Sequence, residues 1–222
     1  MTNRMGAVAL CLVLLIGAVL IIVDAGMIAC APSDGTDVCV SNLKAIARAF
    51  RTYAMDYGGT LPQAEYVRYD IFGNGVGQCP YAEGNHWESF LQPYVSTCRV
   101  FLCPRGAATN KGPIMDNYGW NYDGLSPRYL EGGLARVPTP SETMLVMDSH
   151  NYAMVYGGAD TPERFLQQVG VDLEGGQNPA RHSGRMNVAY VDGHVGSLTA
   201  PELRELIPPQ GGFCAFLGYP ME

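Results

Sequence analysis

The feature that most constrains this chain is an apolar run near its N-terminus. From Met5 to Val23 the sequence has 19 consecutive uncharged, mostly aliphatic residues. As an α-helix such a run is about 28 Å long, close to the hydrocarbon thickness of a bilayer. Arg4 precedes it and Asp24 follows it, so the positive-inside tendency places the N-terminus in the cytoplasm. We expect a short basic leader or cytoplasmic end at residues 1–6 and a transmembrane helix at 7–28, with the bulk extracytoplasmic, in the periplasm or at the cell surface.

Two other interpretations of the N-terminus stay open. Ala29 and Ala31 are small residues that suit a signal-peptide cleavage site, although 19 residues exceeds the usual apolar core of a signal peptide. Cys30 ends a stretch that resembles a lipobox, and lipid attachment there would replace the helical anchor. Each interpretation predicts a different first residue for the mature protein.

Charge and turn-forming residues exclude two broad classes of protein. The chain has 14 basic and 21 acidic residues, so its formal charge of −7 argues against an electrostatic nucleic-acid binder. The 27 glycines and 15 prolines favour turns and irregular backbone, which makes an all-helical bundle a poor expectation. Roughly 200 residues outside the apolar run are enough to bury one core.

Cysteine usage indicates an oxidising compartment. Of the seven cysteines one, Cys11, lies in the apolar run, and the other six are Cys30, Cys39, Cys79, Cys98, Cys103 and Cys214. Six cysteines are compatible with three disulfides, and the sequence does not choose among the 15 connectivities. A zinc site is the alternative for Cys98 and Cys103, but their spacing differs from Cys-x-x-Cys and no second such pair exists. We expect disulfides.

The remainder of the chain predicts an α+β fold that is rich in loops. Apolar residues recur at helical spacing over 37–57, which predicts an amphipathic helix capped by Thr36 or Asp37 and ended by Gly58 and Gly59. Between Gly58 and Pro140 the signals are mainly those of loops. A buried strand at 143–147 ends at Asp148, and a later hairpin has Asp192 and Gly193 as a two-residue type I′ turn.

Several short motifs, in order, carry a resemblance to a known family. Arg181-His182-Ser183-Gly184 is followed by Asp192-Gly193, so that nine residues separate the His from Asp-Gly. This resembles the signature of the bacterial prepilin-type processing-associated (His-x9-Asp-Gly) family. Further pieces that are similar to the same family lie upstream: Cys39-Val40-Ser41-Asn42-Leu43-Lys44, Gly59-Thr60-Leu61-Pro62, Phe101-Leu102-Cys103-Pro104 and Pro140-Ser141-Glu142-Thr143.

The resemblance implies a type IV pilin-like or type II secretion pseudopilin-like protein. Its N-terminal helix would anchor an antiparallel sheet domain, at residues 58–222, outside the cytoplasmic membrane. Its partners would be other pilin-like or secretion-system subunits and the membrane. Such prepilins are cleaved after a Gly and carry a Glu at the fifth mature position. Here Gly6 and Ala7 fit a cleavage point, but the fifth residue after Gly6 is Cys11. A minor or tip subunit, or an unprocessed anchored relative, therefore fits better than a subunit of the filament body.

The candidate site residues are those that could bind a cation. Asp148, His182, Asp192 and His194 offer oxygen and imidazole ligands from strand ends and a hairpin. The resemblance suggests calcium, whereas the mixed His and carboxylate set suits zinc. The alternative is purely structural, because a turn explains Asp192 and a hydrogen bond to Asp148 or backbone explains His182.

A catalytic role has little support in the sequence. The chain contains no Gly-x-Ser-x-Gly elbow, Walker loop, Rossmann fingerprint or His-Glu-x-x-His helix. We therefore expect a structural protein rather than an enzyme. The alternatives are an anchored metal-binding protein or metallohydrolase that uses the candidate ligands together with His150, and a surface adhesin built on the Gly-rich loops between residues 58 and 85.

Overall fold

A computed structural model of the chain describes residues 35–62, 87–106, 117–125, 130, 133–149, 162–170, 181–207 and 212–221. The expected leader, the transmembrane helix at 7–28 with the processing residues Gly6 and Ala7, and both Cys30 and Cys79 lie outside these residues. Within the described part, no helix is both long enough and apolar enough to cross a bilayer.

Helix α2 (Thr36–Asp56) matches the amphipathic helix expected at 37–57. Its buried residues recur every three or four positions, as one face of a helix requires: Cys39, Asn42, Leu43, Ile46, Ala47, Ala49, Phe50 and Ala54. Gly58 and Gly59 follow it with φ of 65° and 92°. These left-handed conformations favour glycine and end the helix as expected.

The start of α2 differs from the prediction. Gly35 is the N-cap residue, with φ of 79°, and no side chain caps the helix. The expectation that Thr36 or Asp37 caps α2 is therefore wrong. The Thr36 hydroxyl oxygen lies instead 3.2 Å from Nδ1 of His182, so this side chain contacts the candidate site rather than its own helix.

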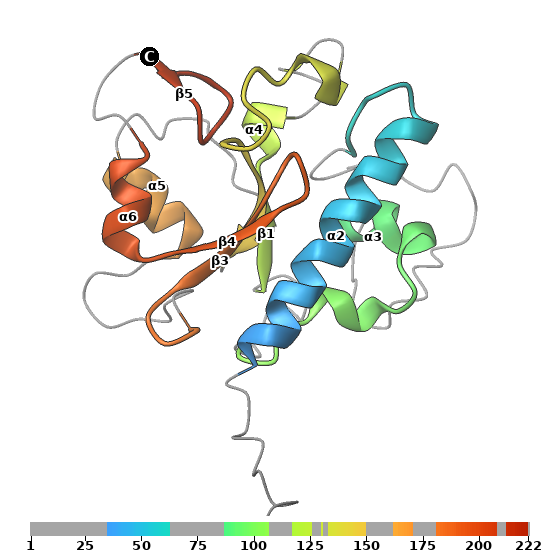
Figure 1. Cartoon of the computed structure of the whole chain (residues 1–222), viewed down its shortest axis with the longest axis horizontal. Helices are drawn as coiled ribbons and strands as arrows, with labels where there is room; N and C mark the ends of the chain where they lie inside the picture. The colour runs from blue at the N-terminus through green and yellow to red at the C-terminus, as the bar shows by residue number, and fades with distance from the viewer. Residues whose placement is uncertain are drawn as a thin grey trace, which may run out of the picture. The chain divides into compact units, whose positions relative to one another are not determined.

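A four-stranded antiparallel sheet forms the centre of the fold (Figure 1). Its strands lie in chain order: β1 (Tyr118–Trp120), β2 (Met144–Asp148), β3 (Met186–Tyr190) and β4 (Val195–Leu198). Every residue of β2 and β3 is buried. Because successive side chains of a strand point to opposite faces, both faces of the sheet must be covered.

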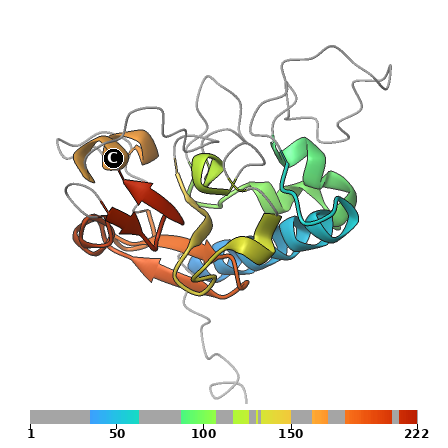
Figure 2. The ribbon, with the colours of Figure 1, turned by 90° about the horizontal axis from the view of Figure 1, so that it is seen from above.

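Two groups of elements cover the sheet. Leu145, Val146 and Ala189 belong to one buried apolar cluster with α2 and α3 (Trp87–Leu91). Met147 and Val188 belong to a second cluster with α5 (Pro162–Val169), α6 (Ala200–Glu205) and the β5 (Gly212–Cys214) to β6 (Tyr219–Met221) ribbon. Figures 1 and 2 show α2 and α3 together, on the side of the molecule away from α5 and α6.

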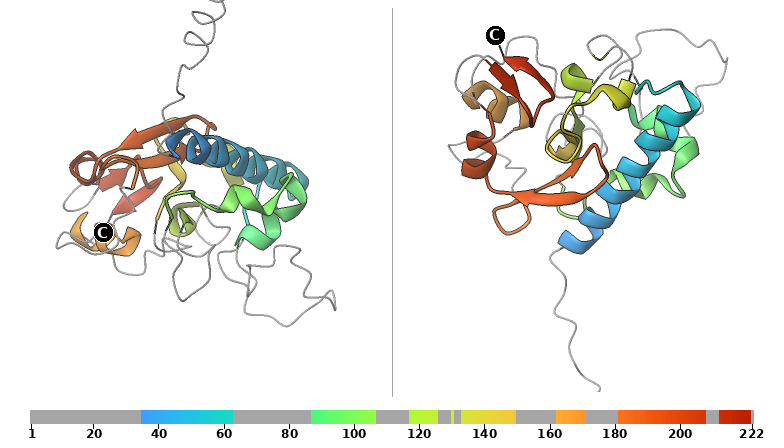
Figure 3. Two further views of the ribbon diagram at one scale, coloured as in Figure 1. Left: turned by 90° about the horizontal axis from the view of Figure 1, so that it is seen from below. Right: turned by 45° about the horizontal axis from the view of Figure 1, so that its top comes forward.

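Short helical turns connect these layers. They are η1 (Gln92–Tyr94), η2 (Cys98–Phe101), α4 (Tyr122–Leu125) and η3 (Gly133–Arg136). Figure 3 shows α2 running alongside the β3–β4 hairpin, and α2 contacts β2, β3 and β4. The chain is therefore α+β, as expected, with the helix of 37–57 packed on an antiparallel sheet.

An aromatic cluster joins α2 to the sheet. The ring of Phe50 lies 5.3 Å from that of Trp87 in α3 and 5.4 Å from that of Trp120 in β1, measured between centroids. All three side chains are fully buried. Rings at these distances and tilts make favourable offset contacts, so Phe50 connects three elements.

The β3–β4 hairpin has a different turn from the one predicted. The Tyr190 N–H donates to the carbonyl of His194, and the Gly193 N–H donates to the carbonyl of Tyr190. The loop therefore has three residues, with Gly193 at φ of 95° and Asp192 outside the left-handed region. This geometry is a type I turn followed by a left-handed residue, and the predicted two-residue type I′ turn is wrong.

A turn with positive φ at both central residues occurs instead just before β3. Ser183 and Gly184 have φ of 54° and 81°, and His182 and Arg185 exchange two backbone hydrogen bonds across them. Positive φ at both central positions is what a type I′ turn requires. The turn fixes the backbone of His182 against the start of β3.

Two local contacts hold the connections around the sheet. The buried Asn121 amide donates to the carbonyls of Met144 and Leu217 and accepts the Gly124 N–H. Gly133 has φ of 70°, and a Cβ there would lie 2.1 Å from the Gly59 carbonyl oxygen. The Asn121 side chain therefore satisfies three buried backbone groups. Position 133 needs a residue without a side chain.

Candidate metal centre

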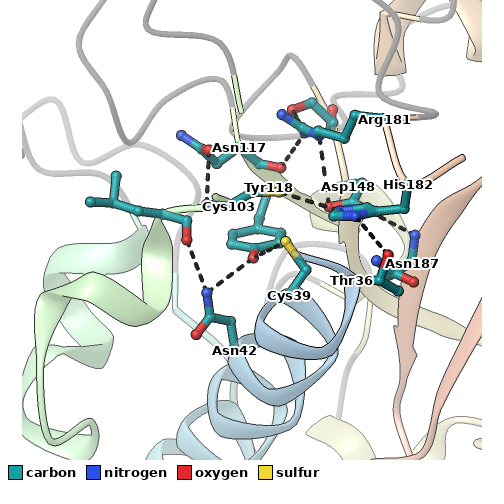
Figure 4. A network of polar contacts seen from close by, with 12 residues as sticks. Thr36, Cys39, Asn42, Cys103, Asn117, Tyr118, Asp148, Arg181, His182 and Asn187 are labelled. Carbon is teal, nitrogen blue, oxygen red and sulfur yellow. Dashed lines mark hydrogen bonds and ion pairs between the residues drawn. The ribbon is translucent and has the colours of Figure 1, made fainter. Parts of the chain in front are cut away.

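Four segments that are distant in the sequence meet at one buried point (Figure 4). Cys39 comes from the first turns of α2, Cys103 follows η2, Asp148 ends β2, and His182 precedes β3. Their ligand atoms all lie within 4.8 Å of one another: two thiol sulfurs, one carboxylate oxygen and one imidazole nitrogen. The four residues are between 0% and 5% exposed. This group, which we call the Cys-Cys-Asp-His cluster, could hold a metal ion.

Strand pairing positions the carboxylate of Asp148. Asp148 pairs with Tyr118 across β1 and β2, and its Oδ2 accepts the backbone N–H of Asn187 in β3 at 2.7 Å. Its Oδ1 lies 4.0 Å from Nε of Arg181. The Arg181 guanidinium also donates to the carbonyls of Asn117 and Ser149, at 2.7 and 3.2 Å. The carboxylate is therefore held by the backbone of β3 and by one cation.

The imidazole of His182 has different partners on its two nitrogens. Nδ1 lies 3.2 Å from the hydroxyl oxygen of Thr36. Nε2 lies 3.3 Å from Sγ of Cys103 and 3.5 Å from Oδ2 of Asp148. When Nδ1 carries the proton and donates to Thr36, the lone pair of Nε2 points into the cluster, which is the tautomer that a metal ligand needs.

Polar contacts from β1 and α2 orient the two cysteines. The Tyr118 hydroxyl donates to Sγ of Cys39 at 3.3 Å, and the Asn42 amide donates to that hydroxyl at 3.3 Å. The Cys103 N–H donates to Oδ1 of Asn117 at 2.9 Å. Each of the two cysteines therefore makes a hydrogen bond with a buried polar side chain. These contacts give the buried polar groups the partners that they need.

The two thiols ionise unequally when no metal is bound. The hydrogen bond from the Cys39 thiol lowers the pKa of Cys103 to about 4, against the effect of burial, and His182 assists. The same hydrogen bond and burial raise the pKa of Cys39. The surroundings therefore favour the thiolate form more at Cys103 than at Cys39, and the thiolate is the form in which cysteine binds a metal.

The other two members of the cluster retain protons more readily than usual. Burial raises the pKa of Asp148 to about 7, although the Arg181 charge opposes the shift. Burial disfavours the charged form of His182, but the Cys103 hydrogen bond and the Asp148 charge outweigh it and raise the pKa of His182. A dication would replace these protons.

The structure unites only half of the predicted cation ligands. Asp148 and His182 are in the cluster, but Asp192 and His194 lie beyond the other end of β3, about 16 Å away at 3.3 Å per residue. There Oδ1 of Asp192 accepts the N–H of His194 and lies 2.7 Å from its Nδ1, with both side chains well exposed. The prediction of Asp192 and His194 as metal ligands is corrected, because these residues stabilise the hairpin loop. His150 lies outside the described residues.

The cysteines also differ from the prediction. Cys39, Cys103 and Cys214 are free thiols, which corrects the expectation of a disulfide for each, whereas Cys98 is disulfide-bonded as expected. Cys214 is buried in the second apolar cluster. Sequence reasoning raised Cys103 as a zinc ligand only in a pair with Cys98, and it missed the combination with Cys39 because the two residues lie 64 positions apart. Their only signal was that both fall within pieces of the family resemblance that also include His182.

Similarity to known proteins does not assign the cluster a role. Comparisons of the chain with protein-family models, curated proteins and solved structures found no significant match.

Proposed function

We propose that the protein is a pilin-like or pseudopilin-like structural subunit, anchored in the cytoplasmic membrane and acting in a type II secretion or type IV pilus-like assembly. The observation that carries this proposal is α2. A 21-residue amphipathic helix packs along an antiparallel sheet and follows, within the sequence, an apolar run of bilayer length. A helix in this position connects a membrane anchor to a folded extracytoplasmic domain.

The exposed surface of α2 supports contact with other subunits. Among the described residues, four large apolar side chains are exposed, and three of them lie on α2 or directly after it: Val38, Met55 and Tyr57. The fourth is Leu206, which follows α6. Single exposed apolar residues are common on protein surfaces, so the support lies in their concentration on α2, and crosslinking at these positions tests it. Other pilin-like or secretion-system subunits are the partners that this role requires.

Burial of the Cys-Cys-Asp-His cluster favours a structural role over a catalytic one. A catalytic metal keeps an open coordination position for water or substrate, whereas all four residues here are at most 5% exposed. The hydrolase alternative also needs Asp192 and His194, which the fold places at the other end of β3. We therefore propose no catalytic activity for this centre.

The first test is the N-terminus of protein extracted from native membranes. Intact mass and N-terminal sequencing distinguish the interpretations, because processing predicts a start at Ala7 and an unprocessed anchor predicts a start at Met1. Either start, in the membrane fraction, agrees with the proposal. A start near Cys30 or Pro32 contradicts the anchored subunit and favours an adhesin or another exported protein.

The second test is site-specific photo-crosslinking in native cells. A photoreactive residue at Met55 or Val38 on α2 is expected to yield covalent products with a second subunit of an assembly. The same residue at Leu206 is the matched control, since it is similarly apolar and exposed but follows α6. The proposal fails if α2 gives no products, or if Leu206 gives the same products as α2.

A further inference from the structure

We propose that Cys39, Cys103, Asp148 and His182 bind a structural Zn²⁺ ion that ties α2, the segment after η2, strand β2 and the turn before β3 together. The cluster is within the folded domain, so this inference stands independently of the membrane assembly. Its failure would leave the subunit role untouched, and the converse also holds.

The donor set selects the type of metal. Two thiolates, one imidazole and one carboxylate are ligands that zinc accepts in tetrahedral sites. Calcium and magnesium require oxygen ligands, and here two of the four ligand atoms are sulfur. Of the two cations that the sequence raised, zinc is the one that this site fits.

The distances between the ligand atoms are already close to those of a tetrahedral zinc site. In a tetrahedral zinc site with these ligands, neighbouring ligand atoms are about 3.3 to 3.8 Å apart. The Cys103 sulfur is 3.3 Å from Nε2 of His182, and that nitrogen is 3.5 Å from Oδ2 of Asp148. The largest separation in the cluster stays within 4.8 Å, so closing the site requires side-chain movements of about 1 Å.

Residues around the cluster orient its ligands. The Thr36 hydroxyl contacts Nδ1 of His182, and the Asn187 N–H donates to Asp148. Such outer contacts fix the tautomer of a His ligand and the orientation of a carboxylate ligand. Thr36 is the first residue of α2, so the start of this helix supplies an outer contact to the His ligand.

Charge also favours a dication. Zn²⁺ with two thiolates and one carboxylate has a net charge of about −1, and the Arg181 guanidinium lies 4.0 Å from Asp148. The assembled site is therefore close to neutral, which a buried position needs. Binding displaces the protons of the cluster to solvent and changes no oxidation state.

The test uses the full-length protein, extracted in detergent, reduced, stripped with a chelator and titrated with Zn²⁺ against a competing chelator. We expect one zinc per chain and, with Co²⁺, thiolate-to-cobalt charge-transfer absorption. Cys103→Ser is expected to weaken zinc binding more than about 100-fold, and Thr36→Val by about 10- to 100-fold. Cys214→Ser is the matched control, because its thiol is equally buried but belongs to the second cluster, and its zinc affinity should be unchanged.

A second measurement uses the wild-type protein, so its result does not depend on whether a variant folds. Denaturation and alkylation of the protein as isolated, followed by mass spectrometry, should find Cys39 and Cys103 both alkylated and one zinc per chain by elemental analysis. A Cys39–Cys103 disulfide with no zinc overturns the proposal and replaces it with a covalent crosslink at the same point. Substoichiometric zinc below about one in ten chains after reduction, or a Cys103→Ser protein that binds zinc like the wild type, overturns it equally.

Discussion

The side chain of Phe50 offers the clearest test of how α2 is attached to the sheet. Phe50→Ala removes a fully buried ring that contacts Trp87 and Trp120. Truncation of a buried Phe costs about 3 to 5 kcal/mol, and two aromatic contacts place this site near the upper end of that range. For a chain of this size, the midpoint of thermal unfolding should fall by roughly 8 to 20 °C.

The assay follows from the composition of the chain. Trp87 and Trp120 are its two tryptophans, and both contact Phe50, so intrinsic fluorescence during urea unfolding reports on this core directly. Met55→Ala is the control, because Met55 lies on the same helix but is 75% exposed and should change stability by less than about 0.5 kcal/mol. A loss below about 1 kcal/mol for Phe50→Ala would refute the proposed packing of α2.

Three further predictions use the same unfolding assay. Asn121→Ala should cost about 3 kcal/mol, since it leaves buried backbone groups without partners, and a near-neutral result would contradict the hydrogen bonds assigned to it. Burial raises the pKa of Glu88 from 4.5 to about 8, so the folded state holds this proton more tightly and stability should fall as pH rises through this range, by about 5 kcal/mol. Glu88→Gln should remove this dependence, and the exposed Glu142→Gln should not. Gly133→Ala should lower the free energy of unfolding by about 3 kcal/mol or more, because the new Cβ clashes with a backbone carbonyl. Gly58→Ala is the control, with φ of 65° and no atom within 4 Å, and should cost about 1 to 2 kcal/mol. Equal losses for the two variants would show that the clash is relieved.

Local pattern predicted the elements whose burial follows a simple period. The helix at 37–57, the strand that ends at Asp148 and the hairpin after Met186 are all present, because each has an apolar repeat that matches its own geometry. Turn chemistry was less reliable. The Asp192-Gly193 pair predicted a type I′ turn, but the chain forms one at Ser183-Gly184, between the bridged residues His182 and Arg185.

The candidate site was predictable only in part, and for a physical reason. Asp148 and His182 were identified because each stands at the edge of a recognisable strand or motif. Cys39 and Cys103 join them only through tertiary packing of α2 against the sheet and of η2 against α2. No local period reports such a contact. The even number of cysteines, and the absence of a Cys-x-x-Cys pair, therefore favoured disulfides over a zinc site.

The packing of α2 against β3 has a consequence for how the chain must be made. About 140 residues separate the end of α2 from the end of β4, and synthesis at about 5 to 20 residues per second takes roughly 10 to 30 s to cover them. During that time the apolar face of α2, which includes Ile46 and Phe50, cannot pack against the sheet. Cys39 likewise cannot contact His182. A cell that makes this chain must therefore shield an apolar helix and an unprotected thiol until the β3–β4 hairpin has emerged.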